Sequence, residues 1–390
     1  MLKLVMRLSP AARLAWFAAV FALCVVVFGA FVRLSNAGLS CPDWPTCYGQ
    51  ITWPHHAHEV ARADAAFPHR PVVPGKPWRE QFHRMIAGTL GVLVLCLALA
   101  AVWRRRWARW TVIGAAVSAA LGTFMYIAGE HVVSSLLAAL AIAAPLYVAA
   151  RLTRAPPWRI AVVTLSLIIF QAMLGMWTVT LLVKPIVVTA HLLGGMATFA
   201  LLAYIALRLT PVGAEGNELA GLRRLVVLGI IVLTAQIFLG GWTSTNYAAL
   251  ACGAGSSAFP HCLGQWWPRM DFHQGFILWR GIGVDYEGGI LDGPARTAIQ
   301  MTHRIGALVV FVYLGALAVM TYRRRLRSYA VAIALALVLQ VALGISIVHF
   351  GFPLPVATAH NGMAAVLLFT LLATLARTQP RIEIPDTGTR

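Results

Sequence analysis

Four histidines are the residues of this sequence whose type and spacing could do chemistry. His83 and His191 each stand near the start of an apolar segment, and His303 and His360 stand at matching places in two later segments. Neutral imidazole is an axial ligand of haem iron, and haem ligands in helical bundles project from facing helices. Two histidines per half of the chain therefore suit one bis-histidine haem per half. A single intramembrane histidine could equally donate to a backbone carbonyl or a hydroxyl group, so the argument depends on the repetition.

An acidic residue stands beside only one of these histidines. Glu80 is three residues before His83, so the two side chains share a helix face, whereas Gln300 holds the corresponding place before His303. This difference suggests that one haem is a substrate and the other an electron-transfer group. A carboxylate near a reacting carbon could accept or relay a proton. The alternative is a salt bridge from Glu80 to Arg84 at the helix end, which spacing alone slightly favours.

An arginine follows a histidine in each half of the chain. Arg84 and Arg304 could contact haem propionates, because a guanidinium group suits carboxylates. They could equally extend to the membrane interface, as long basic side chains often do.

Two cysteine pairs stand in polar segments between apolar ones. Cys41 and Cys47 lie in the first such segment, and Cys252 and Cys262 lie in a later one. Both pairs are on the side opposite the positive loops, where an oxidising compartment allows disulfides. Two loop disulfides, Cys41–Cys47 and Cys252–Cys262, are the simpler interpretation. A redox-active first pair is the alternative, because a short loop rich in Pro and Trp can hold an exposed, reducible bond.

The remaining cysteines and histidines suggest no further chemistry. Cys24 and Cys96 fall inside apolar segments and are expected in the core. Four loop histidines have a spacing that matches no closed zinc site, so the iron of haem is the one metal expected: His55, His56, His58 and His69.

The composition indicates which elements must position these residues. The chain has 390 residues, of which 59% are hydrophobic and 11% charged, against about 25% charged in soluble proteins. A mean hydropathy of +0.76 and long uncharged runs predict an all-α polytopic membrane protein. The formal net charge of +18 follows from Lys and Arg in short loops on one side of the membrane. No basic patch is interleaved with aromatic residues, which argues against nucleic acid as a partner.

Hydropathy predicts ten membrane-spanning segments. They cover residues 14–32, 84–103, 110–127, 132–150, 161–180, 187–207, 225–243, 303–322, 330–350 and 355–376. The positive loops then fall on one side at every pass, which places both termini in the cytoplasm. The hairpin at 110–150 could instead be re-entrant. The first segment is long enough to span the membrane and lacks a clear cleavage site.

Matching offsets indicate an internal repeat. Gly29 and Gly240 each stand twelve residues before a cysteine, and Gln171 and Gln340 each stand twenty residues before a histidine. We therefore expect two tandem four-helix bundles, related by duplication with parallel topology. The hairpin at 110–150 has no partner in the second half, so we interpret it as an insertion that packs outside the first bundle.

The repeat also predicts the domain organisation. An N-terminal half forms the substrate-haem bundle, and a C-terminal half forms the cofactor-haem bundle. The expected segments are the N-terminal half 1–208 with its outer loop 34–79, an inner linker 209–224, the C-terminal half 225–376 with its outer loop 244–296, and a polar tail 377–390.

Several stretches of the chain, together with the residues discussed above, resemble the haem A synthase family. The matching residues are spread over nearly the whole chain: 29–34, 38–47, Glu80 with His83 and Arg84, 174–179, 189–192, 240–243, 264–268, 286–289, His303 with Arg304, and 359–360. The resemblance implies an enzyme that oxidises the C8 methyl of haem O to a formyl group by successive hydroxylations. It implies that the product, haem A, equips terminal cytochrome oxidases. It also implies a bacterial inner membrane or its mitochondrial equivalent, and the absence of a transit-like N-terminus favours the bacterial inner membrane.

The resemblance also assigns roles to residues. The family's haem ligands fall on His83 with His191 and on His303 with His360, its acidic residue falls on Glu80, and its first-loop cysteine pair falls on Cys41 and Cys47. Haem O would then bind in the first half, and a haem b in the second half would carry electrons. The expected partners are haem O, haem A, the lipid bilayer, haem O synthase and cytochrome oxidase assembly factors.

One departure and two rival functions stay open. The family usually has eight spans, so residues 110–150 add two, and this addition touches no motif residue. A membrane thiol–quinone oxidoreductase using Cys41 and Cys47 would explain the cysteines but not the histidines. A bis-histidine haem electron carrier would explain the histidines but not the difference between Glu80 and Gln300.

Overall fold

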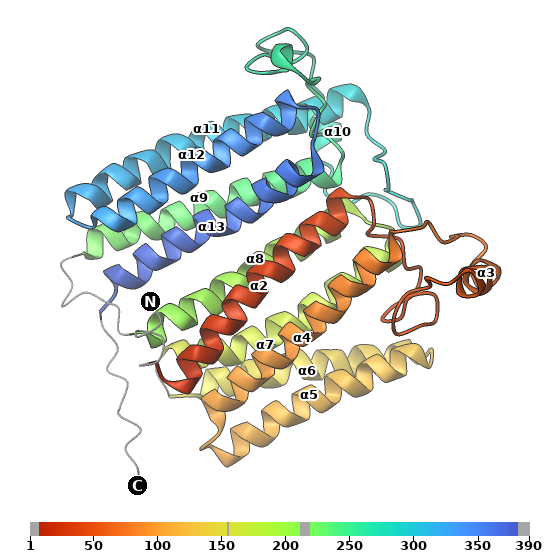
Figure 1. Ribbon diagram of the computed structural model, residues 1–390. Helices are drawn as coiled ribbons and strands as arrows, with labels where there is room; N and C mark the ends of the chain where they lie inside the picture. Colours follow the sequence, from red (N-terminus) through yellow and green to blue (C-terminus); the bar gives the residue numbers. More distant parts are fainter. Residues whose placement is uncertain (1–7, 154–155, 211–218, 381–390) are drawn as a thin grey trace.

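The computed structural model describes residues 8–153, 156–210 and 219–380, and in these residues ten helices are long and apolar enough to cross a membrane (Figure 1). They are α2 (Pro10–Leu34), α4 (Pro77–Val102), α5 (Arg106–Ile127), α6 (His131–Arg151), α7 (Pro156–Thr180), α8 (Pro185–Leu209), α9 (Ala220–Thr245), α11 (Gly293–Arg323), α12 (Arg327–His349) and α13 (Leu354–Thr378). Shorter helices lie in the loops: α3 (Ala57–Ala66), η1 (Ser256–Ala258) and α10 (Phe272–Gly275). The prediction of an all-α polytopic membrane protein with ten spans is confirmed.

Capping residues extend several helices beyond their apolar runs. Ser9 and Asp292 cap α2 and α11 by accepting hydrogen bonds from backbone N–H groups of the first turn, which otherwise lack partners. Proline stands in the first turn of α4 at Pro77, where its missing N–H costs nothing. As a result α4 includes Glu80, and α11 begins at Gly293 rather than after the expected end of the outer loop at 296.

The helices form two similar rings of four. In the first ring, α2, α4, α7 and α8 each contact the next helix, and α8 closes the ring on α2. In the second ring, α9, α11, α12 and α13 make the corresponding contacts. The rings meet through contacts of α2 with α13, α8 with α9, and α8 with α13. Each helix of the first ring has an equivalent in the second: α2 and α9, α4 and α11, α7 and α12, α8 and α13. Exchanging the equivalents leaves these three contacts between the rings unchanged. This is the pattern of parallel repeats around an axis along the membrane normal.

The inserted hairpin lies outside the first ring. Helices α5 and α6 pack along each other, α6 packs on α7, and α5 contacts α4, so the hairpin consists of two full-length helices rather than a re-entrant loop (Figure 1). At its outer tip the ring of Tyr126 contacts the ring of Trp44 in the first loop, with centroids 5.7 Å apart. The expectation that the insertion touches no motif residue was therefore wrong.

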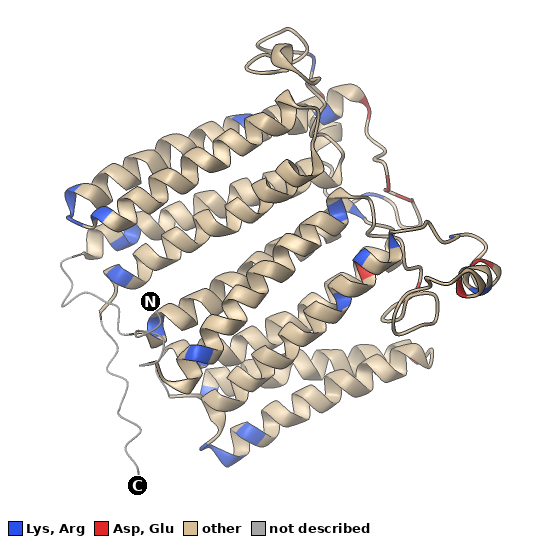
Figure 2. Cartoon of the chain, in the orientation of Figure 1, with Lys and Arg blue, Asp and Glu red and all other residues tan. Residues whose placement is uncertain are grey.

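The charges distinguish the two ends of the helices (Figure 2). Arginines gather where α4 leads into α5 and where α11 leads into α12, and we call this the inner end. The described acidic residues belong to the other, outer end: Asp43, Glu59, Asp64, Glu80, Glu130, Asp271, Asp285, Glu287 and Asp292. Half of the expected inner linker 209–224 and most of the polar tail 377–390 lie outside the described residues, so the domain boundaries stay predictions.

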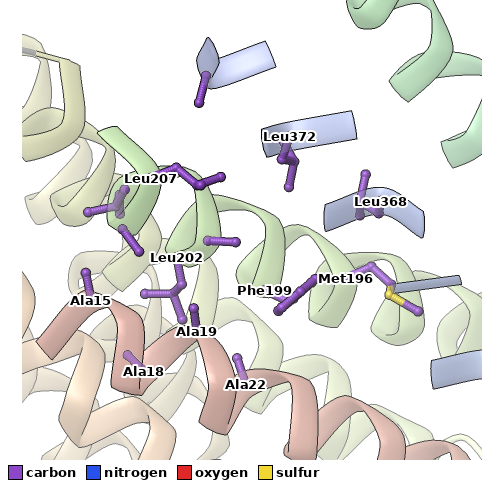
Figure 3. Packing of buried hydrophobic residues seen from close by; sticks show 14 of the residues in the cluster. Ala15, Ala18, Ala19, Ala22, Met196, Phe199, Leu202, Leu207, Leu368 and Leu372 are labelled. Carbon is purple, nitrogen blue, oxygen red and sulfur yellow. The ribbon is translucent and has the colours of Figure 1, made fainter. Parts of the chain in front are cut away.

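The hydrophobic core fills the inner halves of the rings. Small residues of α2, including Ala15, Ala18 and Ala22, let α8 approach closely, and larger residues such as Phe199 and Leu202 fill the space (Figure 3). Close packing of small residues is the usual means by which membrane helices associate. Cys24 and Cys96 were expected in this core from the sequence. That expectation was wrong, because both side chains are exposed.

Candidate functional site

A cavity of 1630 Å³ occupies the outer halves of both rings. This volume exceeds the roughly 300–1,000 Å³ of a pocket for one small ligand. Its lining brings together most of the candidate residues from the sequence: Glu80, His83, Arg84, His191, Gln300, His303, Arg304 and His360. Most of the remaining lining is apolar and comes from both rings and from the inserted hairpin.

The histidines of each pair come from helices on opposite sides of a ring. His83 lies on α4 and His191 on α8, whereas His303 lies on α11 and His360 on α13. Side chains of diagonal helices project toward the centre of a four-helix ring, which is where bundles hold haem.

Each histidine ring lies against a glycine of the neighbouring helix. A Cβ added to Gly29 would lie 2.7 Å from Cε1 of His83, and one added to Gly344 would lie 3.0 Å from Cε1 of His360. The corresponding distances are 3.3 Å from Gly240 to His303 and 3.4 Å from Gly175 to His191. The four glycines therefore provide the space in which the four rings sit.

The hydrogen bonding of the rings differs between the halves. Nδ1 of His303 lies 3.0 Å from Nε2 of Gln236, and Nδ1 of His360 lies 3.1 Å from the carbonyl oxygen of Gln340. In the first half, Nδ1 of His83 is buried and has no hydrogen-bond partner among the described residues, whereas His191 lies against the backbone of Gln171 as His360 lies against that of Gln340.

These features fit a haem in each ring. Paired imidazoles on diagonal helices supply two axial ligands, the glycines leave room for the rings, and the apolar cavity suits a porphyrin. When bound, a haem supplies one-electron redox chemistry, whose potential depends on the axial ligands and on their hydrogen bonds.

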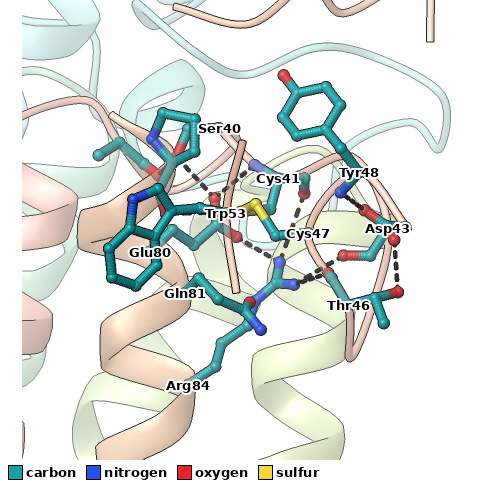
Figure 4. The surroundings of a disulfide bond; sticks show 12 residues. Ser40, Cys41, Asp43, Thr46, Cys47, Tyr48, Trp53, Glu80, Gln81 and Arg84 are labelled. Atoms are coloured by element: carbon teal, nitrogen blue, oxygen red, sulfur yellow. Dashed lines mark hydrogen bonds and ion pairs between the residues drawn. A yellow bond between two sulfur atoms is a disulfide. The ribbon is translucent and has the colours of Figure 1, made fainter. Parts of the chain in front are cut away.

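Glu80 is buried at the cavity wall and forms the salt bridge that its spacing suggested. Its carboxylate lies 2.6 Å from the guanidinium of Arg84. It also accepts hydrogen bonds from the backbone N–H of Cys41 at 2.9 Å and from the hydroxyl of Ser40 at 3.1 Å (Figure 4). Only 5% of Glu80 is exposed, so these bonds hold the carboxylate in one orientation.

The two arginines hold the loops that carry the disulfides. Arg84 donates to the carbonyl oxygens of Asp43 and Thr46 at 2.7 and 2.6 Å (Figure 4). Arg304 donates to those of Ala258 and His261, each at 2.9 Å. In each half, one acceptor stands four residues before the second cysteine of the loop, and the other stands directly before it. Contact with haem propionates stays a prediction for both arginines.

Both expected disulfides, Cys41–Cys47 and Cys252–Cys262, are present. All four cysteines are buried, so the exposed bond required by the redox alternative is not found. The surrounding loops share a pattern that the sequence comparison missed: an aromatic residue, a cis proline, any residue, the cysteine, any residue, glycine and glutamine, at 44–50 and 259–265. Aligning the halves on the second cysteine would have revealed it.

The two outer loops are joined above the cavity. Arg70 of the first loop forms ion pairs at 3.1 Å with Asp285 and Glu287 of the second. The hydroxyl of Tyr48 donates to the carbonyl oxygen of Arg70. Burial, followed by the nearby Asp64 carboxylate, raises the pKa of Tyr48 to about 12, so this hydroxyl keeps its proton. The stretch 286–289 matched the family without an assigned role. Through Glu287 it takes part in the contact between the loops.

Arg33 is a cavity residue whose role the sequence did not suggest. It lies at the outer end of α2 and donates to the carbonyl oxygen of Ser244, at 2.8 Å, and to the hydroxyl of Tyr247. Its guanidinium lies 4.5 Å from the centre of the Tyr247 ring. Ser244 lies at the end of α9 and Tyr247 in the loop that follows, so Arg33 connects the two halves beside the cavity.

Comparison with known proteins yields consistent matches. The family model described as COX15-CtaA, cytochrome oxidase assembly protein, matches residues 12–150 and 131–372. A haem A synthase of Shewanella oneidensis is 37% identical over 356 residues, covering 90% of this chain and 92% of that protein. Haem A synthases of Shouchella clausii and Bacillus licheniformis are 24% and 25% identical, over 77% and 79% of this chain and 72% and 75% of theirs.

Proposed function

This chain belongs to the COX15-CtaA family of cytochrome oxidase assembly proteins, and from this membership we propose that it oxidises haem O to haem A. The supporting observation in the structure is a cavity that is lined by two histidine pairs and in which, among the described residues, Glu80 places a carboxylate beside the first pair only. The reaction makes the protein an oxidoreductase that acts on a C–H group of its substrate, haem O. Its ten apolar helices make it a multi-pass membrane protein.

We assign the substrate to the first ring and the cofactor to the second. His83 and His191 would ligate haem O, and His303 and His360 would ligate a haem b. Two differences support this order. Glu80 gives the first ring a carboxylate where the second has Gln300, and Gln236 of the second ring bonds to Nδ1 of His303, whereas Nδ1 of His83 has no hydrogen-bond partner among the described residues.

In this proposal Glu80 accepts a proton released at the C8 methyl of the substrate. Its carboxylate lies at the cavity wall on the helix that carries His83. Arg84, Ser40 and the N–H of Cys41 fix its orientation, which satisfies the requirement that a general base be positioned before the reaction. Outer-loop residues, among them Trp44, Pro45 and Phe259, line part of the cavity, and most of its lining is apolar. A dry site of this kind would protect a formyl product from further oxidation.

The charge distribution supports an orientation in the membrane. Basic residues gather at the inner end (Figure 2), and such residues favour the cytoplasmic side. We therefore propose a bacterial inner membrane, with the inner end in the cytoplasm and the disulfide loops on the oxidising side. The chemistry of substrate and product suggests haem O synthase and cytochrome oxidase assembly factors as neighbours.

The direct experiment is to express the gene in a host that makes haem O but no haem A, then extract and chromatograph the haems. The expected result is haem A that appears only in the presence of the gene. Bound haem b without haem A, at good expression and with haem O present, would contradict the proposed reaction and favour an electron carrier.

A further inference from the structure

Gln236 of α9 is bonded to one of the four histidines in a way that has no counterpart in the first half. Its Nε2 lies 3.0 Å from Nδ1 of His303 and 2.9 Å from the carbonyl oxygen of His303. Two contacts from one amide fix both the place of the glutamine and the rotation of the imidazole ring. Gln236 also lines the cavity.

The first half has an aliphatic residue where the second has this glutamine. Gln236 stands four residues before Gly240, which supports the His303 ring, and Val25 stands four residues before Gly29, which supports the His83 ring. Val25 is buried and offers no polar atom. Nδ1 of His83 accordingly has no hydrogen-bond partner among the described residues.

A second pair of positions changes together with the first. A Cβ added to Gly306 would overlap Oε1 of Gln236, so the glycine is what makes room for the amide. Gly306 stands three residues after His303, and Ile86 stands three residues after His83. Ile86 packs against the hydrophobic core. The second half therefore combines a glutamine with a glycine at the place where the first half combines two aliphatic side chains.

A hydrogen bond to the second ring nitrogen matters for an iron ligand. The partner of that nitrogen fixes the tautomer and the orientation of the imidazole, and its loss typically weakens metal binding by about 10–100-fold. When Nε2 of His303 ligates iron, Nδ1 carries the proton and must donate, so Gln236 would accept this bond through Oε1, with its amide turned from the orientation in which Nε2 faces Nδ1. A ligand without such a partner lacks this restraint and releases its metal more readily.

We propose that Gln236 is a positioning residue that makes His303 a permanent haem ligand, and that Val25 with Ile86 makes His83 an exchangeable one. This inference rests on the proposed function, in which the first ring must bind haem O and release haem A at each turnover while the second ring keeps its haem. The difference between the halves thus separates a substrate site from a cofactor site.

The test measures how fast each ring loses haem b. The purified protein carries His83→Ala, so that only the second ring holds haem, and excess apomyoglobin captures the haem that is released. We expect Gln236→Val to raise the rate of loss about 10–100-fold. Gln236→Glu, which keeps the length and an acceptor, should restore most of the retention. Thr234→Val is the matched control, because this exposed hydroxyl of α9 bonds only to its own helix, and it should leave the rate unchanged.

The reciprocal exchange tests the first ring. In a His303→Ala background, Val25→Gln combined with Ile86→Gly should slow the loss of haem b from the first ring about tenfold. The proposal is overturned if Gln236→Val loses haem no faster than Thr234→Val. If Gln236→Val cannot be purified, the reciprocal pair decides, and an unchanged rate in that pair overturns the proposal.

These measurements do not need haem A formation. A chain that makes no haem A but loses haem faster with Gln236→Val would refute the proposed reaction while supporting the role of Gln236. If the protein makes haem A but neither exchange changes the rate of haem loss, the proposed reaction is supported and the role of Gln236 is refuted.

Discussion

The backbone N–H of Cys41 donates a hydrogen bond to the carboxylate of Glu80 at 2.9 Å. The first disulfide loop is therefore attached to the acidic residue of the cavity as well as to Arg84. In the second ring Gln300 is also buried, but its Oε1 has no partner among the described residues. The loop thus fixes a carboxylate beside the first histidine pair, at a place where the second ring has the neutral amide of Gln300, and the proposed chemistry needs a carboxylate there.

Glu80→Gln should lower haem A formation about 100-fold or more, because the amide cannot accept the proton and general acid–base groups contribute about 10²–10⁴-fold. The amide oxygen can still accept from the N–H of Cys41, so the bound haem content should not change. Haem extraction and chromatography measure both quantities in one sample.

Glu59→Gln is the control for this change. Glu59 lies on α3 in the first outer loop and caps that helix through the N–H groups of His55 and His56, away from the cavity lining. It should leave haem A formation unchanged. Wild-type haem A formation in Glu80→Gln would remove Glu80 from the proton transfer and leave it with the structural role of its salt bridge.

Alanine at the four supporting glycines should lower haem occupancy in the order of the distances to the histidine rings. A Cβ at Gly29, 2.7 Å from Cε1 of His83, must displace the ring, whereas one at Gly175, 3.4 Å from His191, makes ordinary contact. We expect the largest loss for Gly29→Ala, then Gly344→Ala and Gly240→Ala, and the smallest for Gly175→Ala. The haem content per purified protein measures the series.

Gly114→Ala provides the matched control, because a Cβ at this position of α5 meets nothing within 4 Å. Alanine also has a higher helix propensity than glycine by about 0.8–1.0 kcal/mol, so haem content should be unchanged and stability equal or higher. A uniform loss across all five variants would mean that the glycines serve helix packing in general rather than the rings.

The number of spans and the histidine pairs could be predicted because their signals are local or repeated. A run of about 20 apolar residues is enough to predict a span. His83 and His303 occur at matching places in a duplicated pattern. Helix ends were less predictable, since hydropathy marks the apolar part only, while Asp292 and Pro77 set where α11 and α4 begin.

The orientation of side chains around each helix could not be predicted in the same way. Membrane helices are apolar on all sides, so the sequence carries no polar face that would show which side is buried. Cys24 and Cys96 were expected in the core for this reason and are exposed instead. Gln236 was missed because it differs between the halves, and a search for repeated residues finds only what the halves share.

Arg304→Leu should make the disulfide Cys252–Cys262 easier to reduce. Hydrogen bonds to charged groups contribute about 1.5–3 kcal/mol each, and Arg304 makes two to the loop. The buried sulfurs must become exposed before a thiol can attack, so we expect reduction at least about tenfold faster. Alkylation after timed exposure to dithiothreitol, followed by mass spectrometry, measures the rate.

The comparison for this change is Arg296→Leu. Arg296 lies on the same helix, and its hydrogen bond goes to Asp292 at the start of that helix, so the reduction rate should match the wild type. An unchanged rate in Arg304→Leu would mean that the disulfide and the backbone hold the loop without the arginine.

The contact between Trp44 and Tyr126 should link the inserted hairpin to the first disulfide loop. Their rings meet edge to face with centroids 5.7 Å apart, and such pairs contribute about 0.5–1.5 kcal/mol. Trp44→Ala and Tyr126→Ala should each speed the reduction of Cys41–Cys47 about two- to tenfold. Because both changes remove the same contact, the double variant should be no faster than the faster single one.

The alternative outcome for this pair is equally measurable. Rates that multiply in the double variant would mean that the two residues act independently and that the hairpin does not hold the loop. Phe124→Ala is the control, since this residue of α5 is 62% exposed and should leave the rate unchanged. Non-additive rates together with an unchanged control would establish that the hairpin, which has no counterpart in the second half, supports the loop that carries the bonds to Glu80.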